Sequence, residues 1–477
     1  MQQERSRMMG TMPMGKLIMK VSVPIMISMT VQALYNVVDS IFVAQHSAAE
    51  FTAVSLANPL QMLMISVSTG LAVGINSLVS RRLGEKRPEE ARLAAHNGIM
   101  LEIIGFLLFL LFGLFLARPA MNLLYAGAGE EILTYGGDYL QIVTIYSLGL
   151  FVSVVMERFM QVTGNTVLSM FTQIFGAIVN VILDPIMIFG YLGCPEMGVR
   201  GAAIATVIGQ CSSMTLGLIL NQVKNKELRI SRKYFRPDGR MMGEILAVGI
   251  PSVIMSSISS VMAVLLNNIL MIYGTVAVNV LGAYIKLNSF VFMPVFGLSN
   301  GLVPIIGYNF GARDKKRLYS SIRIGLLVAE IILCVGMVLF LTIPQVFLKL
   351  FESEDSGEAF MEIGCTALRI IGITFPFAAA GITFSTVFQA VGKGVNSMVM
   401  SLCRQLVVLL PVAWLFSKLS PNSPDLVWWC FLVSEAVALV ISVFMLANVQ
   451  KKIFAHLGEE KTAGEIQKKS SEKERIH

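Results

Sequence analysis

The sequence consists largely of long apolar runs separated by short polar segments. About twelve of these runs reach the roughly 20 residues that cross about 30 Å of hydrocarbon as a helix. Their hydrophobicity is continuous rather than alternating, which predicts helices and excludes a porin-like barrel. We therefore expect an all-α integral membrane protein with twelve transmembrane helices, near residues 17–44, 51–79, 93–117, 133–156, 166–190, 199–222, 244–273, 278–306, 319–343, 360–390, 395–417 and 425–450.

An internal repeat divides these helices into two sets of six. When one half of the chain is slid over the other, Pro24 falls on Pro251 and Gln161 falls on Gln389. Six spans return a chain to its starting side, so the pseudo-symmetric lobes are parallel repeats related by an axis along the membrane normal. Transporters of this kind bind substrate between the repeats. The repeat predicts an N-terminal tail at 1–16, an N-lobe at 17–222, a linker at 223–243, a C-lobe at 244–450 and a disordered tail at 451–477.

Charge is scarce and unevenly distributed. Only 14% of the residues are charged, against about 25% in an ordinary globular domain. About 30 of the 37 Lys and Arg lie on one side of the predicted membrane, whereas the loop at 351–358 on the other side is acidic. By the positive-inside rule both termini are cytoplasmic. This orientation explains the net charge of +7 without a nucleic-acid partner.

The sequence motifs do not predict an enzyme. The segment GLSNG at 297–301 fits the hydrolase pattern G-x-S-x-G, which needs a strand before its turn, but it lies in an apolar run. Its counterpart at 70–74 reads GLAVG, so both halves keep G-x-x-x-G, a surface for close helix packing. The sequence has no phosphate-binding loop, and its four His and six Cys form no metal-binding pattern. We therefore expect no cofactor, and an ion gradient remains as the energy source.

A polar stripe lies inside the first span, in the segment VQALYNVVDSIF at 31–42. Gln32, Tyr35, Asn36 and Asp39 are spaced i, i+3, i+4 and i+7. These positions share one face of a helix. The stripe therefore predicts a polar surface inside the bundle.

Asp39 has a partner at a similar depth. It lies about 33 Å along the first span, and Asp184 lies about 27 Å along the fifth span, which runs in the same direction. Asn180 is one turn below Asp184, and Thr206 lies about 10 Å into the sixth span from the outer side. All four side chains can meet in the outer half of the N-lobe.

This group of four could bind a cation. Two carboxylates in a low-dielectric pocket repel each other and are poorly solvated, so the pair should bind a proton readily. With the Asn amide oxygen and the Thr hydroxyl, the group is also an oxygen-only cage suited to Na⁺. The residues leave H⁺ and Na⁺ both open, and a polar plug is the alternative. Leu266 and Val412 occupy the C-lobe positions equivalent to Asp39 and Asp184, so ion sensing is expected in the N-lobe.

Other ionisable residues fall well inside the predicted spans. Each is costly in hydrocarbon and is either functional or a buried polar contact between helices. Glu435, Arg369 and Arg404 could pair with one another. Besides the two aspartates, the set comprises Glu102, Lys286, Glu330, Arg369, Arg404 and Glu435.

Five segments together carry a family resemblance. They read GKLIMKVSVPIMISMTVQALYNVVDSIFVA at 15–44, RRLGEKR at 81–87, MQVTGNT at 160–166, NVILDP at 180–185 and GAAIAT at 201–206. In combination they resemble the MATE family (multidrug and toxic compound extrusion), particularly its MepA-like bacterial branch. The resemblance covers about residues 10 to 450.

The resemblance implies a monomeric two-lobe antiporter in a bacterial cytoplasmic membrane, which exports varied, often cationic amphipathic small molecules. Carried over, its cation-coupling residues would be Asp39, Asn180, Asp184 and Thr206. The polar stripe would link that site to the substrate cavity through Gln32, Tyr35 and Asn36. Pro24 could let the first helix bend when the acids are neutralised. A cation site in the C-lobe is in doubt, because Ser259 stands where sodium-coupled relatives of another branch have an acid.

Two alternatives remain at this stage. A flippase or exporter of lipids or lipid-linked saccharides would keep the same fold, and Lys286 and Arg404 could then meet lipid phosphates. A passive channel is disfavoured, because two-lobe repeats suit alternating access and no span shows a ring of like charge.

Overall fold

The computed structural model describes residues 4–125, 129–349 and 357–454. Within these ranges, ten single helices are long and apolar enough to cross a membrane. Two further pairs of helices, bent by 48° and 50°, raise the number to 12 if each pair is one span. The predicted all-α, multi-span fold is therefore confirmed. Most of the acidic loop at 351–358 and the tail after residue 454 lie outside the described residues.

The helices follow the two predicted sets of six spans. The first set comprises α1 (Glu4–Thr11), α2 (Met14–His46), α3 (Ala48–Gly84), α4 (Pro88–Phe115), α5 (Ala117–Leu124), α6 (Glu130–Ile145), α7 (Leu148–Val162), α8 (Thr166–Ile188) and α9 (Val199–Lys224). The second comprises α10 (Gly239–Leu270), α11 (Thr275–Gly311), α12 (Lys315–Thr342), α13 (Pro344–Leu348), α14 (Gly357–Gly372), α15 (Phe375–Ala390), α16 (Gly394–Leu402), a π-helix (Cys403–Val408), α17 (Leu409–Leu419), α18 (Asp425–Trp428) and α19 (Cys430–Val449).

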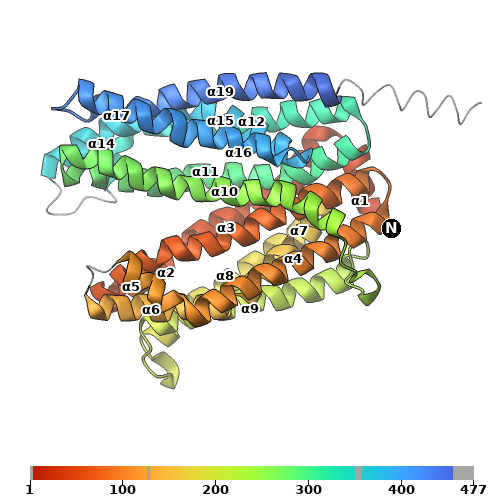
Figure 1. The fold of residues 1–477 in the computed structure, drawn as a ribbon, viewed down its shortest axis with the longest axis horizontal. Coiled ribbons are helices and arrows are strands. Elements are labelled where there is room, and N and C mark those ends of the chain that lie inside the picture. The colour runs from red at the N-terminus through yellow and green to blue at the C-terminus, as the bar shows by residue number, and fades with distance from the viewer. Residues whose placement is uncertain (1–3, 126–128, 350–356, 455–477) are drawn as a thin grey trace, which may run out of the picture.

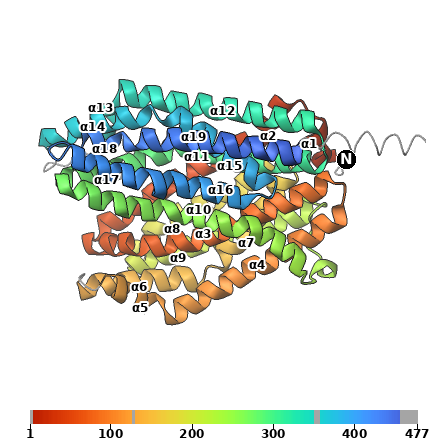
Figure 2. The ribbon, with the colours of Figure 1, turned by 45° about the horizontal axis from the view of Figure 1, so that its top comes forward.

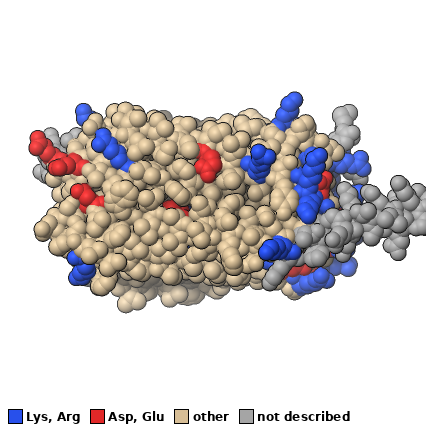
Figure 3. All heavy atoms as spheres, turned by 90° about the horizontal axis from the view of Figure 1, so that it is seen from above, with Lys and Arg blue, Asp and Glu red and all other residues tan. Residues whose placement is uncertain are grey.

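The two lobes lie side by side, with α2 to α9 in the N-lobe and α10 to α19 in the C-lobe (Figure 1). Their ribbons come together at the end where the N-terminus lies and spread apart at the other end. We call the first the basic end, which holds the connections 84–88, 224–239 and 311–315. Figure 3 shows Lys and Arg gathered there on one face of the molecule, with few charged side chains along its middle.

Glycines bring the lobes into close contact at the basic end. A side-chain carbon at Gly84 would meet the carbonyl of Tyr308, and one at Gly311 would meet the carbonyl of Arg81. The two G-x-x-x-G segments act in the same way, as predicted: that of α3 packs against α10, and that of α11 packs against α2. A larger residue at these positions would push the backbones apart.

Polar contacts cross between the lobes at the same end. Arg82 in α3 donates from Nη2 to both carboxylate oxygens of Glu244 in α10, at 3.0 and 3.1 Å. The Ser77 hydroxyl donates to the carbonyl of Gln389 in α15 at 2.6 Å. The closed end is therefore held by both backbone packing and directed hydrogen bonds.

Two spans bend at equivalent places in the repeat. The break between α6 and α7 falls at Ser147, and that between α14 and α15 falls at Thr374, which matches Ser147 in the register that places Pro24 on Pro251. Each hydroxyl donates to the backbone carbonyl three residues before it, that of Thr144 or of Ile371. The bend belongs to the fold of each lobe, and it turns the following helix, α7 or α15, toward the centre.

The segments outside the spans are anchored as well. α1 lies beside the C-lobe helix α11 (Figure 2), and Arg317 donates to the Met9 carbonyl at 2.9 Å. The backbone N–H of Ser231, within the linker at 223–243, donates to His96 Nε2 of the N-lobe at 3.0 Å. The start of the first span is thus held by the opposite lobe.

Candidate functional site

A cavity of about 470 Å³ lies between the lobes. Its walls come from α2, α3, α7, α8 and α9 on one side and from α10, α11, α15, α16 and the π-helix on the other. Among the described residues, three charged side chains line it: Glu157, Arg158 and Arg404. Its size and its mixture of apolar and polar groups suit a small amphipathic molecule.

The two lobes contribute equivalent walls with different chemistry. In the register that places Gln161 on Gln389, α7 and α15 carry matching positions on the cavity. All six residues line it: Glu157, Arg158 and Gln161 in the N-lobe, and Ser385, Thr386 and Gln389 in the C-lobe. The repeat therefore supplies the shape of the cavity, and the N-lobe supplies an acid on its α7 wall.

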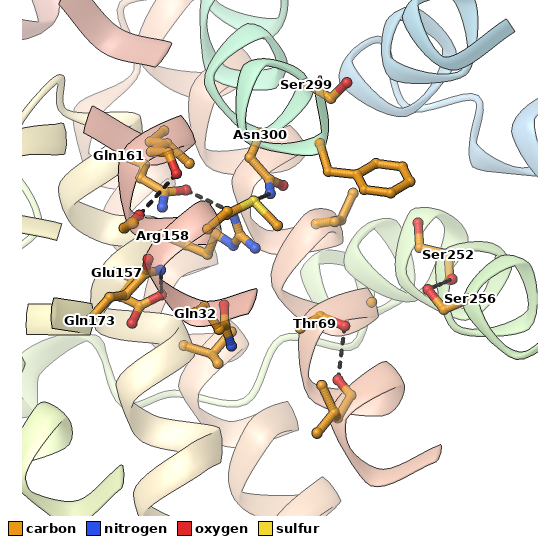
Figure 4. A pocket seen from close by; sticks show the side chains of 18 of the residues that line it. Gln32, Thr69, Glu157, Arg158, Gln161, Gln173, Ser252, Ser256, Ser299 and Asn300 are labelled. Carbon is orange, nitrogen blue, oxygen red and sulfur yellow. Dashed lines mark hydrogen bonds between the residues drawn. The ribbon is translucent and has the colours of Figure 1, made fainter. Parts of the chain in front are cut away.

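Glu157 and Arg158 are buried within α7 (Figure 4). Gln173 of α8 donates to the Glu157 carboxylate, and Arg158 donates to Gln161 Oε1 at 2.7 Å. Our prediction that the fourth span ends near residue 156 is wrong, because α7 continues to Val162. Two adjacent charged residues, Glu157 and Arg158, are typical of a polar connection between spans. Here their hydrogen-bond partners, Gln173 and Gln161, lie inside the lobe.

Asp39 and Asp184 meet in the N-lobe. Asp39 of α2 is half-buried and Asp184 of α8 is fully buried. Their carboxyl groups are close enough to influence each other electrostatically, and Asn180 donates from Nδ2 to Asp184 Oδ1 at 3.1 Å. The structure therefore brings together three of the four residues that the sequence suggested for a cation site.

Three oxygen atoms at this place lack a hydrogen-bond donor. They are Asp39 Oδ1, Asp184 Oδ2 and Asn180 Oδ1, and each is buried. A buried acceptor without a donor is costly, and a proton or an oxygen-liganded cation would satisfy such atoms. The donor set thus fits H⁺ or Na⁺. The described part of the chain has no group of three or more His, Cys, Asp or Glu side chains that could hold a metal ion.

The other predicted residues surround this pair unevenly. Gln32 and Tyr35 line the cavity one turn apart on α2, whereas Asn36 is exposed and is not among the lining residues. Thr206 lines the cavity, and its hydroxyl donates to the Ala202 carbonyl at 3.0 Å. The structure therefore connects the polar stripe to the cavity through Gln32 and Tyr35 and not through Asn36.

The sequence did not predict two further polar residues on this side of the N-lobe, Tyr139 and Gln61. Tyr139 of α6 is buried beside Asp39, and its hydroxyl donates to Gln61 Oε1 of α3 at 3.3 Å. A polar pair on two different spans leaves no spacing signal within either one. The aspartates are thus enclosed by α3 and α6 as well as by α2 and α8.

The remaining intramembrane ionisable residues separate into three groups. Glu102 is buried in α4, with neither carboxylate oxygen hydrogen-bonded. Arg404 and Glu435 form an ion pair at 3.2 Å. This agrees with our prediction that members of the set Glu435, Arg369 and Arg404 could pair with one another. The others lie at least partly exposed and away from the cavity lining: Lys286, Glu330 and Arg369.

The MatE family model matches residues 24–186 and, a second time, residues 251–415. The chain belongs to the MatE family. The two matches begin at Pro24 and at Pro251, the prolines that the internal repeat places in register. Membership makes this MatE protein a membrane transporter rather than an enzyme.

Similar proteins cover both lobes of this MatE chain. The multidrug export protein MepA of Staphylococcus haemolyticus is 26% identical over 443 residues, which covers 92% of this chain and 94% of the relative. MepA of Staphylococcus aureus is 26% identical over 446 residues, covering 91% and 95%. A solved outward-facing conformation of a multidrug resistance MATE family transporter of the MOP superfamily matches with a TM-score of 0.87 at 23% identity, covering 96% of this chain and 99% of the other. The resemblance seen in the sequence is thereby confirmed.

Proposed function

We propose that this protein is a cation-coupled antiporter that exports varied, often cationic amphipathic compounds by alternating access. The coupling ion is H⁺ or Na⁺, and the protein needs no cofactor. The observation that carries the proposal is that Asn180 belongs to both sites. It lines the cavity between the lobes and also donates to the buried carboxyl pair.

The geometry suggests how the two events are coupled. A cation that binds between Asp39 and Asp184 satisfies the oxygens that lack a donor, which changes the contact between α2 and α8. Tyr35, one turn before Asp39, carries that change to the cavity wall. Cation binding would thereby disfavour the bound substrate, because a ligand shifts a conformational equilibrium only through differential contacts.

Glu157 provides the attraction for a cationic substrate. Its carboxylate is the only acid among the described residues that line the cavity. In a site with little water, a charge-assisted contact is stronger than it would be in bulk solvent. The similarity to multidrug export proteins supports our proposal that the substrates are varied rather than one metabolite.

We place the protein as a monomer in a bacterial cytoplasmic membrane, with both termini and the basic end in the cytoplasm. The enrichment of Lys and Arg at that end supports this orientation (Figure 3). With the lobes closed at the basic end, the cavity faces the outside, ready to release substrate and take up the coupling ion. Of the two cations on which the lipid-export alternative rests, Lys286 is exposed and does not line the cavity, whereas Arg404 does line it.

The decisive test is efflux from proteoliposomes that contain ethidium, under imposed proton or sodium gradients. We expect gradient-driven efflux in the wild type and its loss in Asp39→Asn and Asp184→Asn. Glu330→Gln, which changes a half-buried acid of α12 outside the cavity lining, serves as the matched control and should transport normally. Normal gradient-driven efflux in both aspartate variants would disprove coupling through this pair, and efflux without any gradient would indicate a channel.

A further inference from the structure

We propose that Arg404 is an anion-binding site in the C-lobe wall, and that the preferred substrates are zwitterionic amphipaths. The cationic group of such a substrate would lie against Glu157 and its carboxylate against Arg404. This inference rests on the export function proposed above and specifies its substrate class.

Arg404 has donors to spare inside the cavity. It is the one charged C-lobe side chain among the described lining residues. Its Nη1 donates to Glu435 Oε1 at 3.2 Å, while its Nε is buried and has no hydrogen-bond partner. A guanidinium carries five N–H donors in a fork that matches a carboxylate. A bound carboxylate would satisfy donors that Glu435 leaves unused.

The backbone around Arg404 has an unusual, hydrogen-bonded conformation. It lies in the π-helix, a local widening that recurs at functional sites. The Ser434 hydroxyl of α19 donates to the Arg404 carbonyl at 2.6 Å and fixes the backbone there. The equivalent N-lobe position in the repeat is Gly176, where α8 packs closely against Gly209. A lobe of this fold therefore does not require an arginine at this place.

The opposite wall carries an acid that can hold the cationic group. Glu157 lines the cavity from the N-lobe and Arg404 lines it from the C-lobe. Arg158 also lines the cavity, and its Nε likewise is buried without a partner, but the whole side chain is buried and donates from Nη1 to Gln161 within its own lobe. Arg404 is only half-buried and is the more accessible guanidinium. A molecule with separated charges would engage both walls, whereas a purely cationic one would leave Glu435 as the partner of the Arg404 guanidinium.

Rhodamine B and its ethyl ester form a matched pair of fluorescent probes. Both carry a delocalised cation, but only rhodamine B has a carboxylate. Binding to the full-length protein in lipid nanodiscs would be measured by fluorescence anisotropy. We expect Arg404→Gln to raise the Kd of rhodamine B about tenfold and to change that of the ester by less than about twofold. The control Lys286→Gln removes an exposed charge of the same lobe and should alter neither value.

Further variants separate recognition from folding. Arg404→Lys keeps the charge without the fork and should give an intermediate Kd for rhodamine B. Glu435→Gln removes the competing carboxylate and should leave rhodamine B binding unchanged or tighter. Equal weakening of both dyes by Arg404→Gln, or no weakening of either, would overturn the proposal. So would a loss in Glu435→Gln as large as that in Arg404→Gln, because the ion pair would then be structural.

The outcomes also distinguish this inference from the export function. If the wild type binds both dyes and Arg404→Gln does not discriminate between them, only the zwitterion proposal fails. If the wild type binds neither dye and shows no gradient-driven ethidium efflux, the export function fails and this inference fails with it.

Discussion

Glu157 is the residue through which the cavity would hold a cation. We expect Glu157→Gln to raise the Kd for ethidium about tenfold, because a charge-assisted contact is worth about 1.5 to 3 kcal/mol and the amide keeps only a neutral one. Equilibrium binding to the purified protein, followed by ethidium fluorescence, would measure this. Glu330→Gln is the control at an acid outside the cavity lining, and an equal change in both variants would contradict a specific role for Glu157.

At the residue scale, the sequence predicted that Asp39 and Asp184 lie close together, but it did not predict the charged wall of the cavity. Asp39 and Asp184 are single acids within long apolar runs, so their depth could be counted from the helix rise. Glu157 stands next to an arginine close to the end of an apolar run, and its burial depends on Gln173 of another helix. Tyr139 depends in the same way on Gln61. Contacts between spans leave no periodic signal within one span.

The first span lacks one backbone hydrogen bond at Pro24, and α8 bonds to the carbonyl left over. Pro24 lies inside α2 and cannot donate to the carbonyl of Lys20, four residues earlier. Thr166, the first residue of α8, donates its hydroxyl to that carbonyl at 3.3 Å. The same helix α8 carries Asp184. The Lys20 carbonyl that Pro24 leaves without its usual donor is therefore bonded to α8, the helix that would respond to the proposed coupling ion.

Pro24→Ala tests whether α2 works as a hinge. Alanine restores the N–H and favours a straight, stiffer helix, so we expect gradient-driven efflux to fall about tenfold, which corresponds to roughly 1.4 kcal/mol in the rate-limiting step. Equilibrium binding of ethidium should stay within about twofold. Pro59→Ala is a matched control, because Pro59 also lies inside a spanning helix but is exposed. Parallel losses of binding and efflux would point to misfolding instead of an impaired hinge.

At the element scale, hydrophobic length predicted the spans to within about six residues at each end, the largest difference being the end of the fourth span, and it did not predict where they break. At each bend, at Ser147 and at Thr374, a hydroxyl bonds back to the chain, but the same bond also occurs inside unbroken helices, as at Ser28 in α2. The π-helix at 403–408 is bonded to α19 through Ser434, a contact between spans that the local sequence does not encode. The internal repeat places Ser147 and Thr374 at equivalent positions. It therefore predicts the second bend only after the first one is known.

For the whole molecule, alternating access requires the basic end, for which we propose the cytoplasmic side, to open. Its closest contacts are between backbones, so we expect Gly84→Val to prevent closure by pressing a side chain against the Tyr308 carbonyl. A membrane-impermeant maleimide would then label a Ser256→Cys reporter in the cavity from the basic side, and transport would be lost. Gly243→Ala, at a nearby glycine with open space around it, should leave both unchanged. Unaltered labelling in Gly84→Val would rule out this contact as the seal.

The Arg82 and Glu244 pair offers a second, electrostatic test of the same closure. The pair joins the lobes at 3.0 Å but is partly exposed, with side-chain exposures of 10% and 28%. We therefore expect Glu244→Gln to cost the closed state only about 1 kcal/mol, which is roughly a fivefold shift in the ratio of basic-end-closed to basic-end-open molecules. Distances between spin labels placed on the two lobes would report that ratio.

The control for this pair uses the same carboxylate. Arg240 also pairs with Glu244, at 3.4 Å, but it lies in the same helix and is 81% exposed. Arg240→Gln removes a positive charge beside Glu244 without removing any contact between the lobes, so the ratio should not move. If it moved as far as in Glu244→Gln, the effect would come from the general charge of the basic end. If only the Glu244 variant shifted the ratio, the pair across the lobes would be the part of the seal that opens and closes with the transport cycle.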